Sequence, residues 1–315
     1  GDPLDGAPEP LTSAPATPAK RSRRVTKRPR RNETTPKFES TAKPRRTPSS
    51  DLAAAVVESY RCTHDGYSVD FLIAHPELNA AFTSACRQRT QGGSAAEFNQ
   101  ELLRIRKAGK LDVPTTKRVH VPRKHVERFI FASEIATQII QNEGHTLDEI
   151  LCDPALAQRF DELSSTLAPG FEPFHYRWGA LRVRKEHKKR SQSQARLDGR
   201  TRRRRGKRVA CLSEFNFQDV PRVAGTYRIR GVGSTELFVG ESDDLRSRLE
   251  EQFRSMTVGL YAKENGVELD DWLAETQIDV FPGIDAPLRS GFHSYLVERL
   301  MPKLNYRKIE ESSVA

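Results

Sequence analysis

Cysteine is scarce in this sequence, and its few copies lie far apart. The chain has Cys62, Cys86, Cys152 and Cys211, with no Cys-x-x-Cys pair among them. This spacing excludes the usual zinc motifs and a disulfide framework. We therefore expect a reducing compartment, either the cytoplasm, in association with a nucleoid, or the nucleus.

Long hydrophobic runs are also missing. The longest apolar stretch, residues 129–140, is short and is interrupted by Glu134. A helix needs about 20 predominantly apolar residues to span a bilayer, and no secretory signal peptide is recognisable. The sequence therefore predicts no membrane-spanning segment.

Positive charge is abundant but is confined to two segments. The formal net charge of the chain is +10. Residues 1–50 contain twelve Lys and Arg against five acids, and residues 181–208 contain fourteen against two, which leaves −9 for the remainder. Cationic blocks of this kind bind polyanions, because each neutralised phosphate releases a condensed counterion. Neither block has the apolar face of an interfacial membrane helix, so DNA is the expected partner.

The second basic block supplies the candidate nucleic-acid contacts. They are Arg182, Arg184, Lys185, Lys188, Lys189, Arg190, Arg202, Arg203, Arg204 and Arg205. The aromatic residues Tyr176 and Trp178 precede this block, together with Leu181. We interpret these three as a hydrophobic anchor for a basic helix; the alternative is that the aromatic rings stack on bases.

Composition and periodicity divide the chain into five parts. Residues 1–50 are rich in Pro, Ser, Thr, Lys and Arg and bury too little apolar surface to order themselves, so they are predicted to form a disordered basic arm. A helical domain follows at 51–180, a basic linker or helix at 181–210, an α/β module at 211–309 and a tail at 310–315.

The sequence of the helical domain contains clear signals for the beginnings and ends of helices. Pro76 stands at the first turn of one expected helix, and Ser94 and Gly109 bound the next. A single helix is expected over 123–142, and two short helices are broken at Pro154 and Pro169.

The C-terminal part has the pattern of alternating strands and helices. Residues 225–230 and 236–240 alternate as two strands of a hairpin, with a Gly-Val-Gly turn between them. A helix with Ser242 as N-cap follows, then a third strand at 276–283 and a closing helix that ends before Pro302. The fold class is therefore α+β, with a three-stranded sheet flanked by helices.

The order of short motifs in this module resembles the GIY-YIG nuclease family. They are Gly-Thr-Tyr at 225–227, Phe-Val-Gly at 238–240, Asp-Asp-Leu-Arg-Ser-Arg-Leu at 243–249, and Pro-Lys-Leu-Asn at 302–305. The resemblance covers about residues 221–308. Members of that family, which include DNA-repair and homing endonucleases, hydrolyse DNA phosphodiesters with a divalent metal.

The resemblance implies roles for individual residues. Tyr227 matches the tyrosine that helps to activate water, Arg248 the arginine that stabilises phosphate charge, and Asn305 the terminal asparagine. Phe238 replaces the usual second tyrosine, and His293 occupies the position of the metal-binding glutamate.

The metal is where the sequence departs most from the family. Mg²⁺ prefers hard oxygen ligands, and an imidazole at position 293 suits zinc, manganese or nickel better. Glu241 and Asp243, near the end of the hairpin, are candidates to supply a carboxylate instead; the alternative is that these acids at a helix start stabilise the helix dipole. The cofactor expected from the resemblance is a divalent metal: Mg or Mn, or a softer ion if His293 is a ligand.

Three functions remain open at this point. The first is a DNA endonuclease with a modified site. The second is a catalytically degenerate GIY-YIG domain that binds DNA, and the third is a protein-interaction module in which the helical domain binds a protein partner. The oligomeric state is also open.

Overall fold

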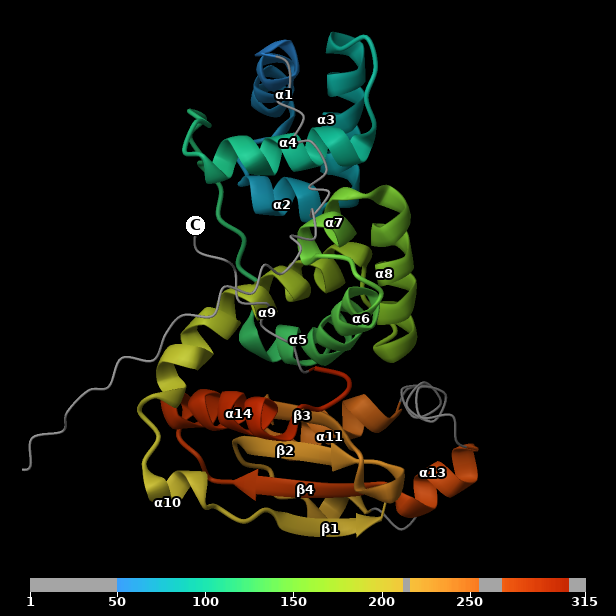
Figure 1. Ribbon diagram of the computed structural model, residues 1–315, viewed down its shortest axis with the longest axis vertical. Coiled ribbons are helices and arrows are strands. Elements are labelled where there is room, and N and C mark those ends of the chain that lie inside the picture. Colours follow the sequence, from blue (N-terminus) through green and yellow to red (C-terminus); the bar gives the residue numbers. More distant parts are fainter. Residues whose placement is uncertain (1–49, 212–215, 255–267, 306–315) are drawn as a thin grey trace, which may run out of the picture. The chain divides into compact units, whose positions relative to one another are not determined.

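The computed structural model describes residues 50–211, 216–254 and 268–305, without the side chains of 50, 187–192, 209–211, 254, 269 and 287. The expected N-terminal arm and C-terminal tail lie outside these residues. All described residues belong to one compact unit. Figure 1 shows its elements in order.

Helices occupy the first part of the described chain. They are α1 (Ser50–Thr63), α2 (Val69–Ala74), α3 (Pro76–Arg89), α4 (Ala95–Lys107), α5 (Arg123–Glu127), α6 (Ile130–Asn142), α7 (Leu147–Cys152), α8 (Pro154–Leu167), α9 (Pro173–Gln194) and α10 (Gly199–Arg202). Two expected start signals are confirmed, since Ser94 forms a capping box with Glu97 and Pro76 begins α3. Ser242 as an N-cap is wrong, because that helix begins at Leu245 and Asp244 accepts from the Ser247 N–H of its first turn. Capping satisfies the free N–H groups of the first turn.

The single helix expected over 123–142 is wrong. The chain forms α5 and α6 instead, separated at Arg128 and Phe129, where Phe129 leaves helical geometry with φ −129°. The apolar pattern continues across this break because Val126, Phe129 and Phe131 are all buried. Periodicity alone therefore could not reveal it.

The later part of the chain forms a mixed α+β region. Its elements are β1 (Lys207–Cys211), η2 (Phe217–Asp219), β2 (Gly225–Arg230), η3 (Val232–Ser234), β3 (Glu236–Ser242), α11 (Leu245–Arg254), α13 (Leu269–Glu275), β4 (Gln277–Pro282) and α14 (Ala286–Leu300). The hairpin, the third expected strand and the closing helix are present. Gly233, in the hairpin turn, has φ +63°, a conformation that glycine adopts without strain.

The sheet has four antiparallel strands in the order β1-β4-β2-β3, so the expected three-stranded sheet is wrong. The additional strand β1 begins at Lys207, within the segment expected to be a basic linker, and pairs with β4. Its residues follow a run of arginines, so the sequence pattern indicated a basic linker. The strand forms by pairing with β4, which is distant in the sequence.

Helices cover the two faces of the sheet (Figure 1). Side chains alternate between the faces of a strand. Val239 and Phe281 therefore pack with Phe292 and Leu296 of α14, whereas Tyr227 and Phe238 join a separate buried cluster with Leu245 and Leu249 of α11.

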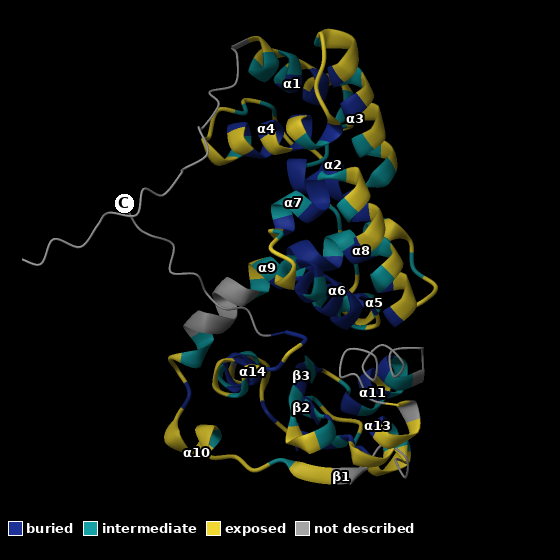
Figure 2. Cartoon of the chain, turned by 45° about the vertical axis from the view of Figure 1, so that its right-hand side comes forward, coloured by how far each residue is buried: buried dark blue, intermediate teal, exposed yellow. Residues whose placement is uncertain are grey.

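The cluster on the α11 face also includes residues of the helical part, such as Phe131 and Ile135 of α6. Helices and strands thus share one continuous core. Figure 2 shows this burial in α2, α6, β2 and β3.

The free edge of β3 is covered by the chain after α14. Lys303 and Leu304 donate backbone hydrogen bonds to Glu236 and Leu237 at 3.1 and 2.9 Å. This contact brings Asn305 next to the middle of the strand.

Candidate functional site

Tyr227 lies on β2, opposite Gly240 of β3. Its ring occupies the space above that glycine: a Cβ atom at position 240 would lie 2.2 Å from the ring Cζ. The Tyr227 side chain is fully buried, and its hydroxyl donates to Oε1 of Gln252 on α11 at 2.5 Å. The glycine of the Phe-Val-Gly motif therefore makes room for the tyrosine of Gly-Thr-Tyr.

The environment of Tyr227 keeps its hydroxyl neutral into the alkaline range. Burial raises its pKa to about 12, although the nearby Arg248 guanidinium, hydrogen-bonded to it, acts in the opposite direction. The charges of Glu134 and Glu127 raise the pKa further. A neutral, buried phenol serves here as a hydrogen-bond donor.

Arg248 projects from α11 beside Tyr227, as the helix pattern predicted. Its side chain is almost buried, and its Cζ lies 5.8 Å from the ring centroid of Phe131 on α6, within the range of a cation–π contact. Phe238 completes this group, with its ring centroid 6.1 Å from that of Tyr227.

Two hollows meet at Arg248. One has a volume of about 240 Å³ and is lined by residues of α5, α6, α9, α14 and the end of β3; the other, of about 530 Å³, is lined mainly by α5 and α11. Arg123 and Glu127 of α5 line both. The helical part therefore contributes directly to the surroundings of the arginine.

His293 and Asn305 meet at a single peptide of β3. The His293 Nε2 lies 3.0 Å from the Val239 carbonyl oxygen, and the Asn305 side-chain amide donates to the same oxygen at 2.6 Å. The Val239 N–H donates to Asn305 Oδ1 at 3.2 Å. Because a carbonyl only accepts, geometry assigns the proton of His293 to Nε2.

The five residues predicted from the resemblance thus form two groups. Tyr227, Phe238 and Arg248 lie on the α11 face, whereas His293 comes from α14, on the opposite face. All five are buried, with 0–6 % of each residue exposed. Glu134 lies near both groups, because the Asn305 amide donates to it at 3.5 Å and its charge acts on Tyr227.

Arginines hold the two carboxylates, Glu241 and Asp243, that the sequence offered as alternative metal ligands. Arg289 of α14, whose side chain is 2 % exposed, pairs with Asp243, and its Nε lies 3.9 Å from Glu241. Arg123 pairs with Asp243 as well, at 2.8 Å. Within the described part of the chain, no three His, Cys, Asp or Glu side chains form a group that could hold a metal ion. In this arrangement the residues do not fit a divalent metal.

Sequence reasoning missed several members of the site. Gln252 stands four residues after Arg248 on α11, a spacing that places the two on one side of the helix. Glu134 could have been identified as a site residue, because it is an acid that interrupts an apolar stretch. Arg289 carries no comparable signal, since its partners lie at the end of β3 and in the loop that follows it.

The candidate nucleic-acid residues on α9 form ion pairs. Arg182 pairs with Glu186 at 2.8 Å, Arg184 with Asp148 at 2.6 Å and Lys185 with Asp70 at 2.9 Å. The side chains of Lys188, Lys189 and Arg190 lie outside the described set.

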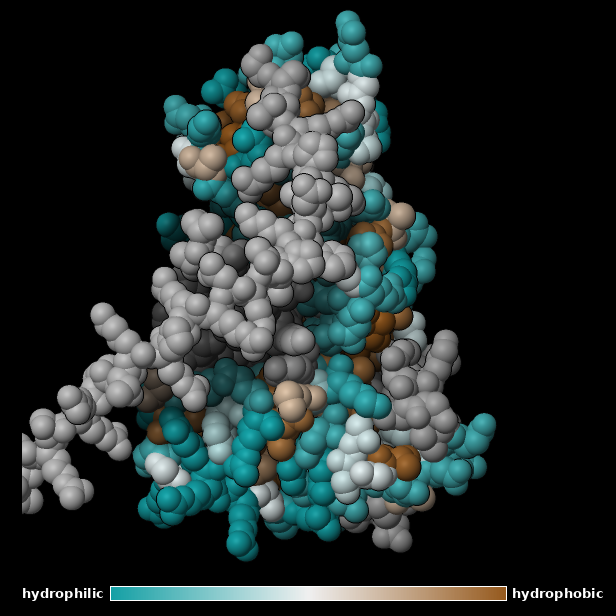
Figure 3. Space-filling model, viewed as in Figure 1, coloured by the Kyte–Doolittle hydropathy of each residue, from teal (hydrophilic) through white to brown (hydrophobic). Residues whose placement is uncertain are grey.

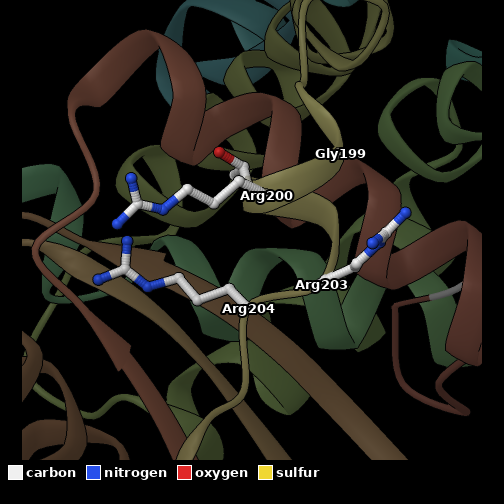
Figure 4. A pocket seen from close by; sticks show the side chains of 5 residues that line it. Gly199, Arg200, Arg203 and Arg204 are labelled. Carbon is white, nitrogen blue, oxygen red and sulfur yellow. The ribbon is translucent and has the colours of Figure 1, made fainter. Parts of the chain in front are cut away.

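The arginines around α10 form a separate hollow of about 860 Å³. Arg200, Arg203 and Arg204 line it, and Figure 4 shows Arg200 and Arg204 extending in one direction and Arg203 in the other. Arg204 donates to the Pro282 carbonyl at the end of β4. Among the described residues, these three guanidinium groups form no ion pair with a carboxylate, although the charge of Arg200 acts on Asp198, the N-cap of α10; Arg202 lies over the Tyr295 ring. On the face seen in Figure 3, the surface of this region is largely hydrophilic.

Two negative findings complete the description. None of the described helices combines the length and the apolar character needed to cross a bilayer. Comparisons of the chain with protein-family models, with curated proteins and with solved structures gave no match.

Proposed function

We propose that this chain is a DNA-binding protein whose C-terminal part is a GIY-YIG-type domain that serves as a scaffold. The resemblance is supported by the close approach of Tyr227, Gly240 and Arg248, which come from three separate motifs. Binding rather than cleavage is supported by the state of the site, since His293 holds a backbone carbonyl and Arg289 pairs with Asp243.

The observation that carries this proposal is the arginine-lined hollow beside α10. Arg200, Arg203 and Arg204 line it, and no carboxylate of the described chain forms an ion pair with them. Guanidinium groups match phosphate geometry and bind it in pairs of hydrogen bonds. The hollow therefore fits the backbone of a nucleic acid.

The test compares two triple variants in duplex-DNA binding across a salt series. Replacing Arg200, Arg203 and Arg204 by Ala should reduce the slope of log K against log salt by roughly 2 to 3, at about 0.9 for each phosphate that is no longer neutralised. The matched control replaces three exposed cations of the helical part, Arg61, Arg87 and Lys110, with the same change in net charge. Equal binding by the two variants would contradict the proposal.

Phosphodiester hydrolysis is the second candidate, favoured by the contact between Arg248 and Tyr227. Supercoiled plasmid incubated with the chain in Mg, Mn, Co, Ni or Zn tests it directly. Nicking that disappears in Arg248→Ala would establish a nuclease. Nicking unaffected by this change would come from a contaminant, and absence of nicking with every metal would leave DNA binding as the function.

A further inference from the structure

A fourth hollow lies along α9, between this helix and the extended segment that precedes α5. Its volume is about 340 Å³, near the lower end of the range of small-ligand sites. Four of its lining residues, Trp178, Leu181, Arg182 and Lys185, follow one another at spacings of three, one and three. They therefore occupy one face of α9. We call this hollow the α9 groove.

The α9 groove combines an apolar floor with a cationic rim. Val119 and Val121 of the extended segment line it together with Trp178 and Leu181, and Arg123, Arg182 and Lys185 supply positive charge. No acidic residue of the described chain lines it. Trp178 is half-buried and stacks on Phe174 with ring centroids 5.9 Å apart, which fixes the orientation of its indole.

The charge near the groove exceeds that of its carboxylate partners. Asp70 binds Arg106, Arg184 and Lys185, and Asp148 binds Arg184 and Lys107. These four cations share two carboxylates, so this group carries two more positive charges than negative ones, whereas Arg182 of the groove pairs with Glu186, and Arg123 with Glu127 and Asp243. The Lys185 ammonium also lies 5.6 Å from the Trp178 ring centroid. A surplus of this kind attracts an anion to the edge of an aromatic site.

The groove is continuous with the site at Arg248. Arg123 and Arg182 line both the α9 groove and the hollow of about 240 Å³ that Arg248 lines. In the sequence, α9 runs on into the basic block. A nucleic-acid strand at the groove thus lies on the same helix as the first part of the basic block.

We propose that the α9 groove binds an unpaired nucleotide, with its base against Trp178 and the neighbouring valines and its phosphate at Arg182 and Lys185. The proposal rests on the DNA-binding function proposed above. Aromatic side chains stack on any base, and arginine and lysine neutralise the adjoining phosphate. Paired bases of a duplex are not available for this contact. The protein should therefore prefer DNA that contains a single-stranded segment.

The test measures the affinity of the full chain for three labelled probes: a ten-residue oligothymidylate, an abasic strand with the same number of phosphates, and a duplex. Oligothymidylate should bind more tightly than the abasic strand by about fivefold to a hundredfold, the range expected for one stacked base. Trp178→Leu should abolish this difference and leave duplex binding unchanged. Val119→Glu, which places a carboxylate in the groove and spares the Trp178–Phe174 stack, should act in the same way.

The failures of the two proposals are distinguishable. Equal affinity for oligothymidylate and the abasic strand, or a base preference that survives in both variants, would overturn the groove assignment even if duplex binding is intact. Tighter binding of an acidic, aromatic peptide than of oligothymidylate, lost in Val119→Glu, would assign the groove to a protein partner. Absence of binding to all three probes would remove the DNA-binding function itself.

Discussion

The role of His293 can be tested by changing what it offers to the Val239 carbonyl. Its Nε2–H donates to that oxygen, and the residue is only 4 % exposed. Gln at this position still offers an N–H donor. Glu offers only acceptor oxygens when ionised. The two variants are close in size and differ mainly in this property.

The expected costs follow from the contact. His293→Gln should lower the free energy of unfolding by about 1 kcal/mol, the usual value of one hydrogen bond. His293→Glu should cost about 3–5 kcal/mol, since it buries a charge beside a carbonyl oxygen while Arg289, one helical turn earlier, is already paired with Asp243. At about 2–4 °C for each kcal/mol in a domain of this size, the Glu variant should melt roughly 6–20 °C below the parent.

The stability of the Glu variant should fall as the pH rises. Burial raises the pKa of the introduced carboxyl above its value in the unfolded chain, about 4.3. A group with a raised folded pKa causes no loss of stability below its unfolded pKa, and the loss grows as the pH rises through the folded pKa. The Glu variant should therefore approach the Gln variant at about pH 4 and fall below it at about pH 7.5. Differential scanning calorimetry at both values measures this difference.

Two results would refute this reasoning. Equal melting temperatures of the Glu and Gln variants near neutral pH without metal would mean that His293 does not hold the Val239 carbonyl. A large rise of the Glu variant's melting temperature on addition of Mg²⁺, absent in the Gln variant, would mean that position 293 is a metal-ligand position. Arg289 would then have to release Asp243 or Glu241.

Two further predictions concern Tyr227. Gly240→Ala should destabilise the fold by about 1–3 kcal/mol through overpacking against the Tyr227 ring, whereas Gly199→Ala, which has open space around it, should not. Thermal unfolding of both variants checks this, and Gly240→Ala should cost less when it is added to Tyr227→Ala than when it is added to the parent. Equal stability of Gly240→Ala and Gly199→Ala would contradict the prediction. The pKa of Tyr227 is raised to about 12, so the contribution of its neutral hydroxyl to stability is complete below the unfolded pKa near 10 and is lost as the pH rises through about 12. Tyr227→Phe should therefore lose less stability than the parent between about pH 9 and about pH 11. Denaturant titrations at both pH values measure this difference. An equal loss would show that the Tyr227 hydroxyl ionises freely.

Local signals in the sequence predicted most of the elements. These signals act within a few residues, as the capping residue Ser94, Pro76 and the hairpin alternation do. The local structure that they favour therefore does not depend on the rest of the fold. The strand β1 was missed because its pairing partner, β4, lies about 70 residues later in the chain. Sequence patterns indicate a strand from its own alternation and not from a distant partner.

In the candidate site, too, contacts between residues near in the sequence were predictable and contacts between distant residues were not. The contact between Tyr227 and Arg248 followed from a hairpin and one face of α11, which are neighbours in the sequence. The partner of His293 did not, because it is a main-chain carbonyl 54 residues away. A backbone acceptor is present at every residue, and nothing in the sequence marks Val239 as the one that is used.

The segment that follows α14 also determines how this sheet can meet other chains. Exposed strand edges recruit strands from other molecules, either in recognition or in aggregation. Backbone donors of Lys303 and Leu304, together with the Asn305 amide, already occupy the carbonyl acceptors of Glu236, Leu237 and Val239. A foreign strand would have to displace them, which leaves β1 as the other edge of the described sheet.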